Sequence, residues 1–181
     1  MAESPPAATE SGPAISVRQV EFRVPEKTIL RDINLDVARG EVLAIMGMSG
    51  GGKTSLLKCM AGLVKPTSGQ ILIGGEDIVP MPEGELDRVR LKLGLVFQYA
   101  ALFDSLTVYQ NVAFGLRYHS RLGKREMDEV VRSRLDEVEM EGTEKLFPSQ
   151  LSGGMKKRIG LARLCCRSMV GRADRLRVRL A

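Results

Sequence analysis

Tryptophan, histidine and cysteine are scarce in this 181-residue chain, which has no Trp, one His and three Cys. Aromatic residues make up only 4% of the sequence, so a folded core must be mostly aliphatic. The odd cysteine count, with Cys165 and Cys166 adjacent, is a poor disulfide framework, and no Cys/His spacing typical of a zinc site occurs. We therefore expect reduced thiols, with His119 as a surface residue rather than a metal ligand.

Long hydrophobic runs are also missing. No apolar stretch approaches the roughly 18–20 residues that a membrane-spanning helix needs. Residues 1–14 lack both a basic start and an apolar stretch, so we expect a flexible lead rather than a signal peptide. A membrane role would then depend on a partner chain.

Charge is unevenly distributed along the chain, whose net charge is +5. Segment 167–181 carries five Arg and one Asp, whereas the remaining residues carry 22 basic and 21 acidic side chains. The basic excess thus belongs to a short tail, which argues against a nucleic-acid-binding surface. The 44% hydrophobic and 27% charged content is typical of one globular domain.

The hydrophobic pattern predicts an α/β fold. Strands are expected where apolar and β-branched residues alternate or form short runs, at 15–22, 33–37, 42–46, 70–73 and 93–97. Helices are expected at 54–63, 84–90, 107–117 and 124–140, with another opening at Ser152. The run 42–46 is continuously apolar, which predicts a strand buried on both faces.

A glycine-rich loop follows that run. It fits the pattern G-x-x-x-x-G-K-[ST] and consists of Gly47, Met48, Ser49, Gly50, Gly51, Gly52, Lys53 and Thr54, with Ser55 next in the helix. Glycines let the backbone wrap tightly and point N–H groups at an anion, while the helix adds its dipole. Lys53 would reach the β- and γ-phosphates of ATP, and the Thr54 hydroxyl would bind Mg²⁺.

A second glycine-containing loop lies at 151–155. Ser152 is a good helix N-cap, and Gly153 and Gly154 leave N–H groups bare at a helix start, which favours an anion. Alone this signal is weak, because Ser-Gly-Gly is common in plain loops.

The two loops together resemble the ABC transporter ATPase family, from about Ile15 to Arg163. Leu151-Ser152-Gly153-Gly154-Met155 is similar to its signature motif, and Gln98 matches its Q-loop and is a candidate Mg²⁺ contact. The resemblance implies a P-loop NTPase fold with an N-terminal antiparallel β part and a helical subdomain at about 99–165. It also implies a head-to-tail homodimer, in which Ser152, Gly153 and Gly154 contact the ATP on the partner, and a membrane permease.

Segment 97–112 narrows the resemblance to the Mla-type lipid-trafficking ATPases, which predicts transport of lipid or another small hydrophobic molecule. The resemblance places the chain peripherally on the cytoplasmic face of the inner membrane, or on the stromal side in a plastid. The alternatives are a nucleotide-binding fragment without turnover and a different P-loop NTPase such as a small kinase.

The sequence after the signature helix departs from this family. The family continues with an aliphatic strand ending in Asp-Glu and with a switch His, and neither is found in segment 167–181. We therefore expect a truncated or frame-shifted C-terminal part, an incomplete core sheet, and no regular structure in the tail. By resemblance, strands 42–46 and 93–97 would then lack their ladder partners. A basic tail that binds anionic lipid is the alternative.

Overall fold

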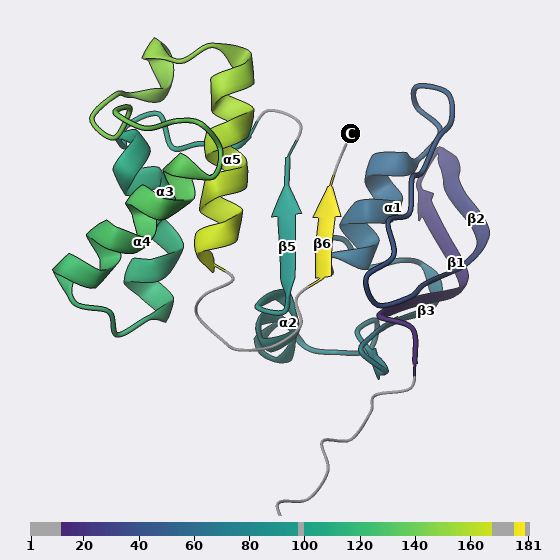
Figure 1. Ribbon diagram of the computed structural model, residues 1–181. Helices are drawn as coiled ribbons and strands as arrows, with labels where there is room; N and C mark the ends of the chain where they lie inside the picture. Colours follow the sequence, from purple (N-terminus) through teal and green to yellow (C-terminus); the bar gives the residue numbers. More distant parts are fainter. Residues whose placement is uncertain (1–11, 98–99, 168–175, 180–181) are drawn as a thin grey trace, which may run out of the picture. The chain divides into compact units, whose positions relative to one another are not determined.

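The computed structural model describes residues 12–97, 100–167 and 176–179. The chain divides into two compact units, one ending at Leu91 and the other beginning at Lys92 (Figure 1). The expected lead 1–14 is described only from residue 12, so residues 1–11 lie outside the described residues. Within the described part, no helix has the length and apolar character needed to cross a bilayer.

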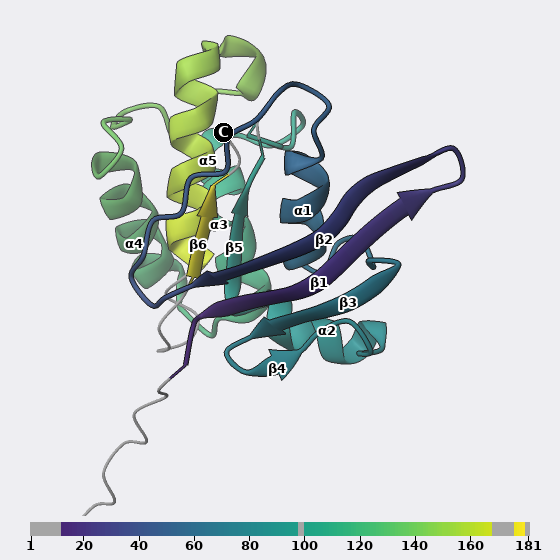
Figure 2. The same cartoon turned by 90° about the vertical axis from the view of Figure 1, so that its right-hand side faces the viewer.

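An antiparallel sheet forms the body of the first unit. Its strand order is β2-β1-β3-β4, with bounds Ile15–Val24 for β1, Lys27–Val37 for β2, Ser68–Ile73 for β3 and Glu76–Asp77 for β4. Strands β1 and β2 form a long hairpin, which is plain in Figure 2. The expected N-terminal antiparallel part is therefore present.

The hairpin carries a bulge that a glycine accommodates. Gln19 has a positive φ of 48° and interrupts the pairing of β1 with both of its neighbours. A Cβ on Gly69 would lie 2.5 Å from the carbonyl oxygen of Gln19, so only glycine lets β3 approach the bulge so closely.

Two helices belong to this unit, α1 at Lys53–Met60 and α2 at Glu83–Arg90. Helix α1 buries Leu56, Leu57, Cys59 and Met60. The helix ends earlier than expected because Gly62 adopts a left-handed φ of 65° and its N–H bonds to the carbonyl of Cys59 at 2.9 Å.

The expected strand at 42–46 is wrong. The structure assigns no strand there, and Val42 and Met46 are 94% and 90% exposed. A continuous apolar run forms a buried strand only when neighbouring strands cover it. The four-stranded sheet of this unit includes no strand from this segment, so all of its apolar side chains except the half-buried Ile45 are exposed.

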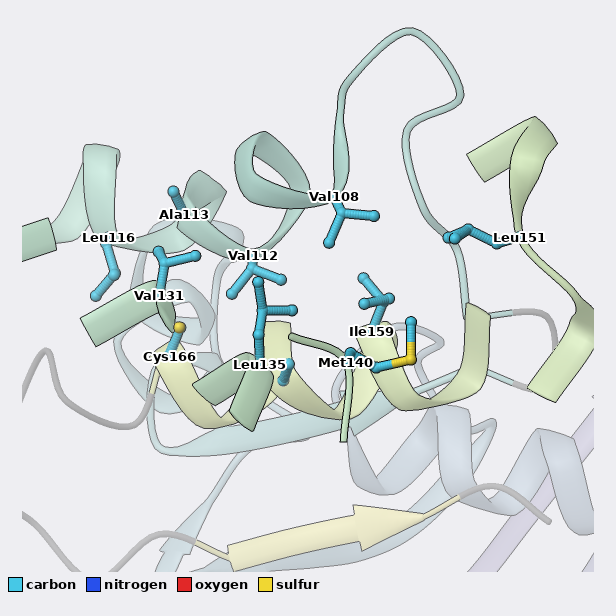
Figure 3. Close-up of a cluster of buried hydrophobic side chains, with 11 residues drawn as sticks. Val108, Val112, Ala113, Leu116, Val131, Leu135, Met140, Leu151, Ile159 and Cys166 are labelled. Carbon is cyan, nitrogen blue, oxygen red and sulfur yellow. The ribbon is translucent and has the colours of Figure 1, made fainter. Parts of the chain in front are cut away.

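Three helices dominate the second unit, α3 at Val108–His119, α4 at Lys124–Asp136 and α5 at Gly153–Arg167. Their facing sides enclose an aliphatic core, shown in Figure 3. The core consists of Val108, Val112, Ala113, Leu116, Val131, Leu135, Met140, Leu151, Ile159, Ala162 and Cys166. Residues at helical spacing on α3, α4 and α5 thus supply the apolar stripes that the sequence pattern requires.

A two-stranded parallel sheet completes this unit (Figure 1). Strand β5, at Leu93–Val96, pairs in register with β6, at Leu176–Arg179. Our expectations of no regular structure in the tail and of no ladder partner for strand 93–97 are therefore wrong for these residues. The alternation of Leu and Val with Arg in β6 has the period of two that a strand requires. Residues 168–175 lie outside the described residues.

Helix α5 packs tightly against β5. A Cβ on Gly94 would lie 2.3 Å from the Cδ1 atom of Leu164, so glycine at this position allows the close approach of strand and helix. Strand β5 and helix α5 thus share a contact surface.

Candidate nucleotide-binding site

The glycine-rich loop connects β2 to α1 and is exposed over 47–51. Gly50 and Gly52 adopt left-handed φ values of 79° and 86°. A Cβ on Gly52 would lie 2.9 Å from both the carbonyl oxygen of Ile29 and the Cδ2 atom of Leu30. Glycine is therefore required at Gly52 for conformation and for space, where α1 begins.

Lys53 folds back over this loop. Its Nζ atom donates hydrogen bonds to the carbonyl oxygens of Gly47 at 2.7 Å and Met48 at 2.9 Å. The Met48 carbonyl also accepts from the N–H of Gly51 at 3.1 Å, which closes a tight turn. The ammonium group is thus held at the loop itself, where a bound phosphate would need it.

The start of α1 offers unpaired donors. The first helical hydrogen bond of α1 runs from the Leu56 N–H to the Gly52 carbonyl oxygen at 2.9 Å. The N–H groups of Lys53, Thr54 and Ser55 therefore have no acceptor among the described residues. No acidic side chain lies in this first turn. A helix N-terminus with free N–H groups and a nearby cation suits an anion such as a phosphate.

Metal binding at this loop would depend on the nucleotide. The described residues contain no group of three or more His, Cys, Asp or Glu that could hold a metal ion. The hydroxyl of Thr54 makes no hydrogen bond to any described residue and is exposed. Mg²⁺ commonly takes few protein ligands and several phosphate and water oxygens, and one free hydroxyl fits that pattern.

The signature-like loop opens α5 in the second unit. The Ser152 Oγ atom accepts from the Met155 N–H at 3.3 Å, which confirms Ser152 as the N-cap. Leu151 is buried in the helical core, whereas Ser152, Gly153 and Gly154 are exposed. The core thus anchors the loop on one side while its bare N–H groups remain open to solvent.

Gln98 and Tyr99 lie outside the described residues, and the next described residue is Ala100. Asn111 of α3 is fully buried, and its side chain holds the loop 103–107. Its Oδ1 atom accepts from the Phe103 N–H at 2.8 Å, and its Nδ2 atom donates to the carbonyls of Phe103, Leu106 and Thr107 at 3.0–3.1 Å. Thr107 caps α3 by accepting from the Gln110 N–H.

Arg163 of α5 contacts the backbone at Ala100 and Ala101, just before the loop 103–107. Its guanidinium donates to the carbonyls of Ala101 at 2.9 Å and Ala100 at 3.2 Å and lies 5.9 Å from the ring centre of Phe103. Ala100 and Ala101 have positive φ values of 58° and 46°, a conformation that needs such support. Neither Asn111 nor Arg163 was predicted from the sequence to be a positioning residue.

Comparison with known proteins identifies the family. The family model described as ABC transporter matches residues 30–169. Over 149 residues the chain is 42% identical to the intermembrane phospholipid transport system ATP-binding protein MlaF of Escherichia coli, covering 82% of this chain and 55% of that protein. It is also 42% identical over 152 residues to the "Probable ribonucleotide transport ATP-binding protein mkl" of Mycobacterium leprae, covering 84% and 44%.

Solved structures agree on the fold. The dimeric bacterial ABC transporter cassette MJ0796 superposes with a TM-score of 0.79 at 31% identity, covering 85% of this chain and 70% of that one. The same cassette in a post-hydrolysis state bound to ADP and Pi also gives 0.79, at 30% identity. The chain spans about half the length of the curated relatives it matches. It belongs to the ABC transporter family of ATP-binding proteins, near MlaF, and has the P-loop NTPase fold of that family with an incomplete core sheet.

Proposed function

We propose that the chain binds ATP with Mg²⁺ through the glycine-rich loop, residues 47–55, and serves as the energy-coupling subunit of an ABC transporter. The observation that carries this proposal is the Lys53 ammonium held over an exposed loop beside three free N–H groups of α1. Family membership supports ATP as the nucleotide and argues against a small kinase.

Different groups of the loop would bind the phosphates and the Mg²⁺ ion. Free N–H groups at the start of α1 would bind the phosphate oxygens, and Lys53 would exchange its two carbonyl acceptors for the β- and γ-phosphates. Thr54, and Gln98 by resemblance, would hold Mg²⁺, which neutralises phosphate charge when bound. Hydrogen bonds to a charged group are stronger than those to a carbonyl, so the exchange favours the bound nucleotide.

The signature-like loop would act on a second copy. By resemblance, two ATP-binding domains pair head to tail, and Ser152, Gly153 and Gly154 would contact the ATP held by the partner's P-loop. Their exposure and their unpaired N–H groups at the start of α5 support this role. The dimeric form of a related cassette supports the pairing.

The remaining assignments rest on the relatives. MlaF is named for intermembrane phospholipid transport, which supports a lipid or other small hydrophobic cargo. A permease partner and a peripheral position on the inner membrane or its plastid counterpart are proposed by resemblance to the family. We further propose that residues 15–166 form a partial ATP-binding domain with a helical subdomain at about 99–165, after a lead at 1–14 and before the basic tail 167–181.

Titration of the chain with ATP and Mg²⁺ tests the site. Replacing Lys53 by Ala removes a charged donor, and hydrogen bonds of this kind contribute about 1.5–3 kcal/mol, so affinity should fall by roughly 10- to 150-fold. Lys58→Ala provides a matched control, because Lys58 is an exposed lysine in the last turn of the same helix. Equal ATP binding by Lys53→Ala and Lys58→Ala would reject the proposed site.

A further inference from the structure

The junction between α3 and α4 carries a concentrated positive charge. Segment 117–125 contains Arg117, Arg121, Lys124 and Arg125 and no acidic residue. The next segment, 126–144, contains eight acidic and two basic residues. The two stretches carry net charges of +4 and −6, so the helical unit has a charge asymmetry that its core packing does not require.

These basic side chains are available for an external partner. All four are exposed, and the side chain of Arg125 is 93% exposed although it contacts Glu129 at 3.3 Å. Arg121 and Lys124 make no hydrogen bond or ion pair with any residue that the structure describes. Exposed pairs such as Arg125–Glu129 contribute little to stability, so the charges of Arg121, Lys124 and Arg125 are not needed for folding.

Two of the charges oppose the stability of their own helix. Lys124 and Arg125 occupy the first two positions of α4, where the helix dipole disfavours cations. Only Glu126 complements the dipole there, and it bonds to the Gly123 N–H at 2.8 Å. Charges kept at a position that costs stability indicate a role outside the fold.

Aromatic side chains extend the basic segment. Tyr118 is 71% exposed, and its ring lies 5.0 Å from that of Phe114, which in turn lies 4.6 Å from Phe103. Exposed tyrosine beside arginine and lysine is the combination enriched at the membrane–water interface, where the ring sits at headgroup level and the cations meet lipid phosphates.

We propose that segment 117–125 binds the anionic surface of a lipid bilayer directly. Charge complementarity selects this partner, since four exposed cations, two of them without an ion pair to any described residue, match a dense field of lipid phosphates. A polybasic segment of this kind gains about fivefold in membrane partitioning per Lys or Arg near the surface. The contact does not depend on nucleotide, on the signature-like loop or on the permease.

Vesicle flotation of the 181-residue chain without ATP tests the inference. Phosphatidylcholine vesicles with and without one third phosphatidylglycerol are floated through a density gradient, in which aggregated protein sinks and bound protein rises. The test variant is Arg121→Glu with Lys124→Glu. The matched control is Lys27→Glu with Arg31→Glu, which changes net charge equally at exposed positions of the β1–β2 hairpin.

The parent and the control should float with anionic vesicles only, and binding should weaken at high salt. The test variant should partition about 25-fold less, or weaker still. Because Lys124→Glu improves the dipole of α4, helix content should be kept, which separates lost binding from unfolding. Equal flotation of test variant and parent, equal loss in the control, or flotation with neutral vesicles overturns the proposal. Absence of flotation by the parent also overturns it and leaves a protein partner for this surface.

Discussion

Asn111 should be the most sensitive polar position of the helical unit. Its side chain is fully buried and makes four hydrogen bonds to the backbone of 103–107. Asn111→Ala removes all four and leaves a buried N–H and three carbonyls without these partners. Asn111→Asp keeps the acceptor for the Phe103 N–H but turns a carboxylate oxygen toward three carbonyls, so it should be at least as damaging.

The expected loss of stability in Asn111→Ala follows from the number of hydrogen bonds that the side-chain amide can make. The amide group has two N–H protons for three carbonyls, so one contact is shared, and about three full bonds are lost. At about 1 kcal/mol each, Asn111→Ala should lower the free energy of unfolding by roughly 3 kcal/mol, a large part of a typical margin of about 5–15. Thr107→Ala, which removes only the cap of α3, should cost about 1 kcal/mol.

Urea unfolding followed by circular dichroism would measure both variants, and amide exchange would locate the effect. Protection should fall first across the loop 103–107 and the start of α3. If Asn111→Ala costs less than Thr107→Ala, or if exchange in this loop is unchanged, the loop does not depend on Asn111 and our reasoning is refuted.

Two further results are expected. Gly52→Ala should weaken ATP binding more than Gly50→Ala. Both substitutions incur a left-handed backbone cost of about 1–2 kcal/mol, but of these two glycines only Gly52 has atoms within 4 Å of an added Cβ. Equal losses of ATP affinity in titrations of the two variants would contradict this. At neutral pH, alkylation should modify Cys165 before Cys59 and Cys166, since burial raises the pKa of Cys59 to about 11 and that of Cys166 to about 12. Rapid labelling of all three thiols, measured by mass spectrometry, would show that Cys59 and Cys166 are accessible to solvent and would contradict this expectation.

Local sequence signals predicted most of the elements. The apolar and β-branched pattern predicted strands at 15–22 and 33–37, which form parts of β1 and β2, and Thr107 and Ser152 marked the starts of α3 and α5. These features succeed because a cap or a period of two acts over a few residues. The end of α1 was also readable, since Gly62 is a typical C-cap residue, but the expected helix ran past it.

Features that depend on distant partners could not be predicted in this way. The apolar run 42–46 has the composition of a buried strand, but composition does not show whether neighbouring strands are present to cover it. The reverse error occurred at Leu176–Arg179, where Leu and Val alternate with Arg and the backbone pairs with β5. Pairing is decided by which strands meet, and a single sequence does not specify that.

At the candidate site, too, local features were predicted from the sequence and contacts between distant residues were not. The glycine spacing identified the P-loop because each residue type has a local role, and the structure places Lys53 over the loop. Asn111 and Arg163 were missed because their targets are backbone carbonyls, which carry no sequence signal. Arg163 reaches carbonyls more than sixty positions earlier in the chain.

The contacts of α5 give the helix a mechanical consequence. Ser152 caps one end, and Arg163, eleven residues later, donates to the backbone carbonyls of Ala100 and Ala101. At about 1.5 Å per residue, the two points lie roughly 16 Å apart along a stiff rod. Ile159 and Ala162 fix the rod in the core between them. We therefore expect a displacement of the loop at Ser152 to be carried along this continuous helix to the segment 100–101.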